Sequence, residues 1–485
     1  MLPSPAVTRP CFESADGGAQ SRTGAPGVVL GFLLLLGSGL AATGCRREPV
    51  RLPPAAPVVV VVVDTLRADG LGLYGYPRAT STALDQLAQQ GAVFDRAFTT
   101  SPWTLPSVGS LFTGRYPSGH GSGRAKIQSE SGRSRRVFTS LDSSVPSLAA
   151  ILSGAGYDTA AFVTNTFLRP GFGLAAGFDT YDHTRNRFLA KRRADVMVDQ
   201  ALTWIDAREV ATPWLLVLHL LDPHQPYDPP AGEAGRFTSE YRGELTAPIG
   251  PDSGLVRRVK RGQVELDGAD RAFVRGVYDE EVAFVAAQVA RFLEALVRRS
   301  VLERGLVVLT ADHGEEFFDH GALEHGHTLY QELLRIPFAI WGHGVRAGRY
   351  SEPVSLVDVL PTILDATGVA APDGVDGASL WPLLTARGEL GERQLIAENS
   401  LYGDQRRAIV EWPWKLIVNL EKPEIALYDL ERDPEEGENL AEQRPEVAER
   451  LAAALRERAP RVIRQDPVEL DADTRRELRA LGYLR

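Results

Sequence analysis

Six consecutive valines, Val58 to Val63, run directly into Asp64. A strand with apolar side chains on both faces is covered on both sides, as in a parallel sheet flanked by helices. The segment from Gly305 to Thr310 has the same character, and apolar strand patterns alternate with helical ones as far as about Leu384. The sequence therefore predicts an α/β fold with a doubly wound, mostly parallel sheet.

The pattern changes from about Gly388, where short alternating strands precede two amphipathic helical segments near 445–458 and 472–481. This predicts a smaller C-terminal α+β subdomain with an antiparallel sheet. The expected organisation is a signal or lipoprotein segment (1–45), a Pro-rich linker (46–57), a catalytic α/β domain (58–385) and the subdomain (386–485). Polar stretches at 128–144 and 228–267 predict long surface loops.

Three acidic or histidine side chains follow the two most apolar strands: Asp64 after the valines, and Asp312 and His313 after the second strand. Ligand sites of open α/β sheets lie at the carboxyl ends of the strands. With the hydroxyl oxygen of Thr104, these residues form a mixed oxygen and nitrogen set that suits one divalent cation, Zn, Mn, Mg or Ca. The alternative is that each aspartate only caps a turn, but the repeated arrangement favours a metal site.

Thr104 precedes Leu105-Pro106-Ser107, which predicts a helix from there to about Thr113 with a stop at Gly114. As N-cap, Thr104 would lie at the positive end of the helix dipole, where an anion is stabilised. A capping role alone is the simpler interpretation. Together with the metal ligands, the position favours Thr104 as a nucleophile.

Eight sequence islands occur in one order from about Pro57 to the C-terminus and resemble the sulfatase family of the alkaline phosphatase superfamily. They are Asp64–Asp69 with Tyr74–Tyr76, Thr104–Val108 with Leu111–Pro117, Asp222–Tyr227, Thr310–Gly314, His325–Tyr330, Asp358–Thr362, Asp376–Leu380 and Leu427–Asp433. The resemblance implies the alkaline phosphatase-like fold and a metal-dependent hydrolase of oxyanion esters.

The chain departs from the family pattern at the nucleophile. Family sulfatases carry Cys or Ser there, followed by x-Pro-x-Arg, and a maturation enzyme oxidises this Cys or Ser to formylglycine; this chain has Thr104 and Val108. Cys11 and Cys45 lie outside such a motif, so no formylglycine is expected. Thr65 stands where many members have a second metal-binding Asp, which weakens the expected preference for calcium.

The resemblance also assigns roles to histidines. His224 and His325 are expected as catalytic residues, acting as general acids or as donors to the ester oxygens. His327 is expected to bind substrate, and His120 is a weaker candidate for the same role, with packing in a loop as its alternative. Glu315 and Glu316 are expected to cap a helix start rather than to bind metal.

Three functions remain open. The first is hydrolysis of a phosphoester, or phosphoryl transfer, through a covalent intermediate on Thr104, because phosphothreonine can be cleaved by a second in-line attack at phosphorus. The second is hydrolysis of a sulfuric ester, although a sulfated threonine lacks the exit route of formylglycine. The third is a binding protein without catalysis. The survival of the other site residues favours an enzyme.

The formal net charge of −10 and the lack of a basic stripe argue against a nucleic-acid partner. A small-molecule, lipid or glycan ester is expected as substrate, and the oligomeric state is left open. The apolar segment from Val28 to Ala42 is typical of a signal sequence and leads to Cys45, which resembles a lipidation site. Export to the periplasm or cell envelope with a lipid anchor at Cys45 is therefore expected, with an incidental cysteine as the alternative.

Overall fold

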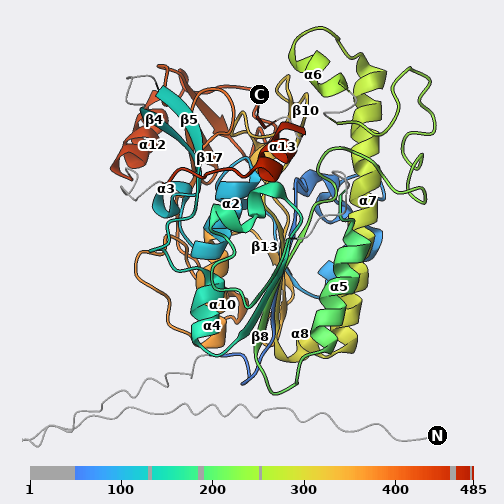
Figure 1. Ribbon diagram of the computed structural model, residues 1–485. Helices are drawn as coiled ribbons and strands as arrows, with labels where there is room; N and C mark the ends of the chain where they lie inside the picture. Colours follow the sequence, from blue (N-terminus) through green and yellow to red (C-terminus); the bar gives the residue numbers. More distant parts are fainter. Residues whose placement is uncertain are drawn as a thin grey trace, which may run out of the picture. The chain divides into compact units, whose positions relative to one another are not determined.

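The computed structural model describes residues 50–128, 134–183, 191–250, 254–458, 466–480 and 483–484 (Figure 1). Residues Val50–Arg485 form one compact unit. The predicted signal segment and Cys45 lie outside the described residues. Within the described part of the chain, no helix is both long and apolar enough to cross a membrane.

An eight-stranded sheet forms the centre of the unit, with the order β13-β2-β12-β9-β1-β8-β6-β7. Its strands are β1 (Val58–Val63), β2 (Ala92–Phe94), β6 (Asp158–Phe162), β7 (Thr180–Asp182), β8 (Trp214–Leu220), β9 (Leu306–Ala311), β12 (Phe338–Gly342) and β13 (Gly348–Tyr350). The valines of β1 are buried along its whole length, as a central strand covered on both faces requires.

The sheet is mostly parallel, as predicted. Strand β1 pairs in parallel with β8 and with β9, whereas β12 runs antiparallel to both of its neighbours. The register places Val63 opposite Ala311. Asp64 and Asp312 therefore leave adjacent strands at the same edge of the sheet.

Helices cover both faces of this sheet (Figure 1). One face carries α1 (Thr82–Ala88), α5 (Ala194–Asp206), α7 (Gly268–Arg298) and α8 (Val301–Arg304). The other carries α2 (Thr104–Thr113), α4 (Leu148–Gly154) and α10 (Val359–Thr367), and α3 (Pro117–His120) and α11 (Trp381–Leu384) pack against α2 and α10. Two helical layers around one sheet confirm the doubly wound α/β fold.

The C-terminal part contains the predicted antiparallel sheet, in the order β15-β16-β17-β18. These strands are β15 (Leu395–Glu398), β16 (Arg406–Glu411), β17 (Trp414–Asn419) and β18 (Ile425–Asp429), followed by α12 (Pro445–Glu457) and α13 (Ala472–Ala480). The exact boundary at residue 385 stays a prediction. Residues 50–57, predicted as a linker, pack on the domain: buried Leu52 donates its backbone N–H to Ala366.

Three local predictions were wrong or incomplete. The segment 128–144 is not simply a loop, because β4 (Gly123–Gln128) and β5 (Ser134–Thr139) form a hairpin. The described residues of the segment 228–267 are irregular except for α6 (Leu255–Lys260) and an isolated bridge of Ile249 with Tyr227. No helix begins at Glu315 or Glu316; β10 (Glu316–Phe317) pairs there with β11 (Leu323–Glu324).

The remaining short elements are β3 (Ala97–Phe98), which pairs with β14 (Val354–Ser355), and α9 (Gln331–Leu334). Five 3-10 turns complete the described structure: η1 (Ala68–Gly70), η2 (Gly72–Tyr74), η3 (Thr166–Leu168), η4 (Pro170–Phe172) and η5 (Leu356–Asp358).

Candidate active site

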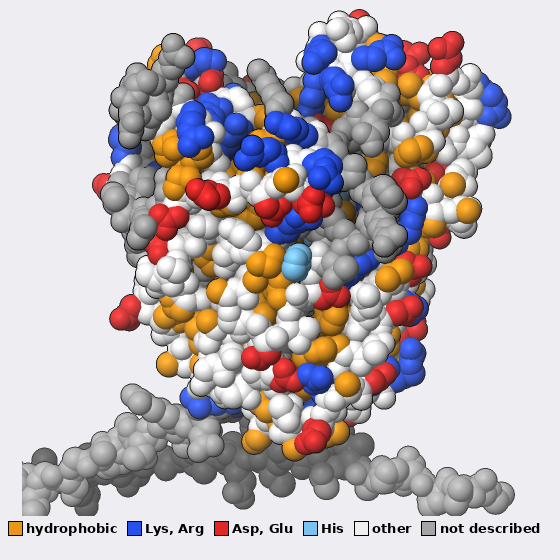
Figure 2. All heavy atoms as spheres, in the orientation of Figure 1, with side chains coloured by type: hydrophobic (Ala, Val, Ile, Leu, Met, Phe, Trp, Pro, Cys, Tyr) orange, Lys and Arg blue, Asp and Glu red, His pale blue; other side chains and the backbone are white. Residues whose placement is uncertain are grey.

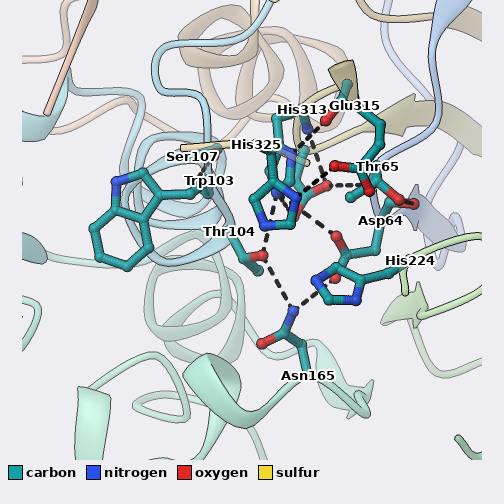
Figure 3. A network of polar contacts seen from close by, with 12 residues as sticks. Asp64, Thr65, Trp103, Thr104, Ser107, Asn165, His224, His313, Glu315 and His325 are labelled. Atoms are coloured by element: carbon teal, nitrogen blue, oxygen red, sulfur yellow. Dashed lines mark hydrogen bonds and ion pairs between the residues drawn. The ribbon is translucent and has the colours of Figure 1, made fainter. Parts of the chain in front are cut away.

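The predicted metal ligands converge at the carboxyl edge of the sheet (Figure 3). The ring nitrogen Nε2 of His313 lies 3.6 Å from Oδ1 of Asp64 and 3.6 Å from Oδ2 of Asp312. All three side chains are fully buried. Because β1 and β9 are neighbours, residues about 250 positions apart in the sequence meet at one point.

His219 belongs to the same cluster, although it was not predicted. Its Nε2 lies 3.8 Å from Oδ2 of Asp64 and 3.7 Å from Oδ2 of Asp312, and the three side chains together could hold a metal ion. His219 lies in β8, one residue before the strand ends. A lone polar residue in that apolar strand was the available signal.

Several polar atoms of the cluster find no hydrogen-bond partner within the described part of the chain. They are Oδ1 of Asp64, Oδ2 of Asp312 and both ring nitrogens of His219. Buried polar atoms are normally satisfied. Orphaned carboxylate oxygens beside imidazole nitrogens are the donors that a divalent cation takes, so these residues fit a metal ion.

The pKa shifts of the two carboxyl groups also indicate a site for a cation. Burial and the negative charge of Asp312 raise the pKa of Asp64 well above its ordinary value. Burial also disfavours the charged form of Asp312, but His313 and His219 outweigh it and hold the pKa of Asp312 below its ordinary value. Two buried carboxylates this close need a compensating positive charge.

His313 is oriented by the backbone. Its Nδ1 lies 2.8 Å from the carbonyl oxygen of Gly314, which directs Nε2 toward the carboxylates. Fixing the second ring nitrogen in this way is typical of histidines that bind metals. Gly314 itself needs to lack a side chain, because a Cβ there would lie 1.9 Å from the carbonyl oxygen of Glu332.

Thr104 faces this cluster from the other side. Its hydroxyl oxygen lies 3.4 Å from Nε2 of His313, and the side chain is buried. The helix α2 begins at Thr104 itself, with Trp103 as the N-cap residue. The predicted position at the positive helix end holds, but the capping position is one residue earlier and Thr104 is the first helical residue.

Asn165 is a second residue that was missed. Its Nδ2 donates to Oδ2 of Asp64 at 2.7 Å and to the hydroxyl oxygen of Thr104 at 3.1 Å (Figure 3). The backbone N–H of Phe167 donates to its Oδ1, which fixes the amide orientation. Asn165 follows β6 at the carboxyl edge of the sheet, and this position was its only sequence signal.

Thr65 adopts a left-handed backbone conformation, with φ at +55°. β-branched residues rarely occupy this region, and such strain is concentrated at functional sites. The conformation brings the backbone N–H of Thr65 within 3.3 Å of Oδ1 of Asp312. The hydroxyl of Thr65 donates to the carbonyl oxygen of Asp64 instead of reaching the cluster.

His224 and His325 lie together beside the cluster, with ring centroids 5.1 Å apart. In His224, Nδ1 lies 2.6 Å from the carbonyl oxygen of Gln225; in His325, Nδ1 lies 2.8 Å from Oε1 of Glu315. Both Nε2 atoms contact the hydroxyl of Tyr483, at 2.9 and 3.1 Å. Tyr483 was not predicted as a site residue.

Burial lowers the pKa of His224 well below its ordinary value, and His325 lowers it further. Burial also lowers the pKa of His325, with His313 as the next cause. Burial raises the pKa of Glu315 to about 7. Burial therefore disfavours the charged form of both imidazoles.

His327 lies at the edge of a pocket of about 850 Å³, which Lys260, Arg124 and Tyr402 also line. Its Nε2 lies 2.7 Å from Oε2 of Glu316. Lys and Arg side chains gather on this face of the molecule (Figure 2). The pocket continues the site toward solvent, so His327 is placed where a substrate could contact it.

His120 is placed differently. It is fully buried; one ring nitrogen contacts Ser110 and the carbonyl oxygen of Pro106, both at 3.1 Å, and the other contacts the hydroxyl of Ser122 at 3.0 Å. Both nitrogens are thus occupied by protein groups. The geometry supports the packing alternative for His120 and not a contact with substrate.

Family profiles and a curated relative match most of the chain. The family profile described as Sulfatase matches residues 57–369, and one described as the C-terminal part of N-sulphoglucosamine sulphohydrolase matches residues 318–465. An arylsulfatase of Clostridium perfringens is 25% identical over 448 residues, which cover 79% of this chain and 89% of that protein.

Solved structures include both sulfatases and phosphonate hydrolases. A structure in complex with its substrate D-glucosamine-2-N,6-O-disulfate has a TM-score of 0.68 at 18% identity, covering 84% of this chain and 99% of the other. The phosphonate monoester hydrolase of Agrobacterium radiobacter has a TM-score of 0.63 at 19% identity, covering 83% of this chain and 94% of the other. At these identities the likeness shows the fold.

Proposed function

Because the chain belongs to the sulfatase family and is a hydrolase of that family, we propose that it cleaves phosphoesters through a covalent intermediate on Thr104. The observation that carries the proposal is the position of the Thr104 hydroxyl. It lies at the positive end of α2, within 3.4 Å of His313 and 3.1 Å of Asn165. An oxyanion ester bound there meets a nucleophile and a cationic site together.

One divalent metal ion would be held by Asp64, Asp312, His313 and His219, with the Thr104 oxygen completing the set. When bound, the ion supplies positive charge that lowers the pKa of the hydroxyl and neutralises the ester oxygens. Two imidazoles with two carboxylates favour a transition metal or zinc over calcium, which prefers oxygen ligands.

In the first chemical step the hydroxyl of Thr104 loses its proton to water, Oγ1 forms a bond to phosphorus, and the bond from phosphorus to the ester oxygen breaks. The departing alkoxide needs a proton in return. Asn165 donates to Oγ1 and so aligns its lone pairs. The contacts of His224 and His325 at Nδ1 leave Nε2 as the acceptor in the neutral ring. A histidine that takes up a proton at Nε2 can then donate it to the departing alkoxide.

In the second step, water attacks phosphorus, the bond to Oγ1 breaks, and phosphate leaves while the hydroxyl is restored. Transfer to another alcohol would follow the same course with that alcohol as the attacking group. Hydrolysis of sulfuric esters is the second candidate, favoured by the arylsulfatase relative. It ranks lower because a sulfated threonine can be released only by attack at sulfur.

The test compares aryl phosphates, phosphodiesters and aryl sulfates on the wild type, Thr104→Val and Thr104→Ser. The valine variant keeps the shape of the side chain and lacks the hydroxyl, so turnover should fall by about 10⁴-fold or more, as for other nucleophile losses. The serine variant keeps a nucleophile and should retain measurable turnover. Turnover of sulfate but not phosphate would reverse the order of candidates, and no turnover by metal-loaded protein would favour a binding protein.

Export to the cell envelope and a lipid anchor on Cys45 remain part of the proposal. The expected result is partition of the full-length protein into a detergent phase and loss of this partition in Cys45→Ser. Persistent partition of the variant would contradict the lipid anchor.

A further inference from the structure

The end of the chain reaches the candidate active site. Tyr483 is the third residue from the C-terminus and follows α13, yet its side chain is buried. Its hydroxyl lies 2.9 Å from Nε2 of His224 and 3.1 Å from Nε2 of His325. One oxygen thus joins two histidines that come from different parts of the sequence.

The remaining ring nitrogens of both histidines are already engaged. Nδ1 of His224 contacts the carbonyl oxygen of Gln225, and Nδ1 of His325 contacts the carboxylate of Glu315. Each imidazole therefore has one nitrogen, Nε2, with which to contact a substrate. In this structure both Nε2 atoms are turned to the oxygen of Tyr483.

We propose that the hydroxyl oxygen of Tyr483 occupies the position of the substrate's ester oxygen, so that the C-terminal segment and the substrate compete for one place. This inference rests on the proposed function, which takes His224 and His325 as the residues that face the ester. A phenol is also chemically close to the alcohol released from an aryl ester. Tyr483 then competes with the substrate for His224 and His325 and limits which substrates bind in the site.

The surroundings of Tyr483 permit its displacement. Its ring packs against Phe167, with centroids 4.9 Å apart, and on another side it lines the pocket of about 850 Å³. Leu484, the neighbouring residue, lines the same pocket and is half-buried. Displacement of Tyr483 breaks its contacts with His224, His325 and Phe167 and leaves the central sheet in place. It also breaks two backbone hydrogen bonds, in which the N–H groups of Tyr483 and Leu484 donate to the carbonyl oxygen of Leu478.

Competition between Tyr483 and a ligand can be measured as a change in the apparent affinity for that ligand. If the site is free for only a fraction of the time, the apparent dissociation constant of a ligand rises by the inverse of that fraction. The hydroxyl of Tyr483 contributes about as much as an ordinary hydrogen bond, which corresponds to a factor of about three to ten. Removing this hydroxyl should tighten ligand binding by that factor.

The decisive variant is Tyr483→Phe, because it keeps the ring contact with Phe167 and removes only the hydroxyl. The matched control is Tyr181→Phe, which removes a half-buried hydroxyl that donates to the carbonyl oxygen of Leu168 and not to His224 or His325. A chain that ends before Tyr483 tests the whole segment. Inorganic phosphate is the probe, and its binding to metal-loaded protein is measured by calorimetry beside KM for an aryl phosphate.

We expect both constants to fall about three- to tenfold in Tyr483→Phe, to fall further in the shortened chain, and to stay unchanged in Tyr181→Phe. Unchanged or weaker phosphate binding in Tyr483→Phe would overturn the inference. The hydroxyl of Tyr483 would then either have no effect on the affinity for phosphate or increase it. Tighter phosphate binding without turnover of any ester supports the competition while refuting the proposed catalysis. Turnover of an aryl phosphate with an unchanged KM in Tyr483→Phe would support the proposed catalysis and refute the competition.

Discussion

The side-chain amide of Asn165 lies 3.1 Å from the hydroxyl oxygen of Thr104, and the same nitrogen lies 2.7 Å from Asp64. One donor thus connects the proposed nucleophile with a proposed metal ligand. Asn165 approaches from the carboxyl end of β6, whereas Thr104 starts α2 and Asp64 follows β1. The relative position of the three groups is set by the central sheet.

Asn165→Ala is expected to lower kcat by about 10²-fold, since a misplaced nucleophile costs a factor of this size. The affinity for metal should fall by about 10-fold, because Asn165 contacts the carboxylate of Asp64 and not the ion, so kcat is measured at saturating metal. Steady-state kinetics and metal titration on the same preparation check this. Asn439→Ala, an exposed asparagine of the C-terminal part, is the control. A loss of metal that accounts for the whole loss of activity would contradict this role.

His219→Ala tests the ligand that the sequence did not reveal. Loss of an outer partner of a metal ligand costs roughly 10- to 100-fold in affinity, and loss of a direct ligand should cost more. Competition between the protein and a chromophoric chelator for Zn²⁺ or Mn²⁺ measures the change. The control is His343→Ala. The side chain of His343 is exposed, so this variant should bind Zn²⁺ or Mn²⁺ with the affinity of the wild type. Equal affinities of wild type and His219→Ala would remove His219 from the metal site.

Removal of metal is expected to lower the melting temperature. Asp64 and Asp312 are buried like charges, and a cation present at about 100 times its dissociation constant stabilises a protein by roughly 2.7 kcal/mol. Thermal unfolding with and without chelator gives the difference for the wild type. The difference should shrink in Asp312→Asn, whose metal-free form lacks the repulsion. An equal response of both proteins would show that the stabilising ion binds elsewhere.

His120 should make the protein sensitive to acid. Burial lowers the pKa of His120 from 6.5 to about 3. Between these values the unfolded chain binds a proton that the folded chain does not, so stability is fully present above about pH 6.5 and declines by up to about 1.4 kcal/mol per pH unit below it. His224 and His325 also lower the stability as the pH falls, because their pKa values are lowered in the folded protein too.

His120→Asn should therefore flatten the acid side of the stability profile without abolishing it. Urea unfolding between about pH 4.5 and 7 measures the slope, and the slope is informative even if the variant is less stable throughout. An identical slope in variant and wild type would mean that His120 is protonated in the folded state.

Arg393→Met should destabilise the protein by about 3–5 kcal/mol, as expected when a buried ion pair loses one partner. Both oxygens of the fully buried Asp358 accept from Arg393, at 2.6 and 2.8 Å. Asp358 precedes α10 of the sheet domain, and Arg393 precedes β15. Denaturant unfolding gives the loss, and the exposed Arg298→Met serves as control. A loss below about 1 kcal/mol would place the pair among ordinary surface ion pairs.

Much of the fold could be predicted because its strongest sequence signal is local. The valines of β1 and the apolar strand β9 each end at a carboxylate, and strands of a parallel sheet end at the same edge. This reasoning located Asp64 and Asp312. It did not locate His219, because His219 lies inside β8 and not after its carboxyl end, and its only signal was to be the one polar residue of an apolar strand.

The other misses have different physical causes. Hairpin β4–β5 is rich in Arg and Ser, so its sequence lacks the apolar alternation by which a half-buried strand is predicted. Asn165 is one polar residue among many in a connecting segment. Tyr483 is far in the sequence from His224 and His325, and only the three-dimensional structure brings its hydroxyl to them.

Helix α2 has no solvent-exposed residue from Thr104 to Thr113. A helix enclosed on every side accepts few substitutions, because each change of volume is felt by its neighbours. Hairpin β4–β5 and the end of the chain, by contrast, line the pocket with partly exposed side chains such as Arg124, Arg136 and Leu484. We expect descendants of this protein to acquire new substrate preferences through the side chains that line the pocket, while helix α2 is inherited almost unaltered.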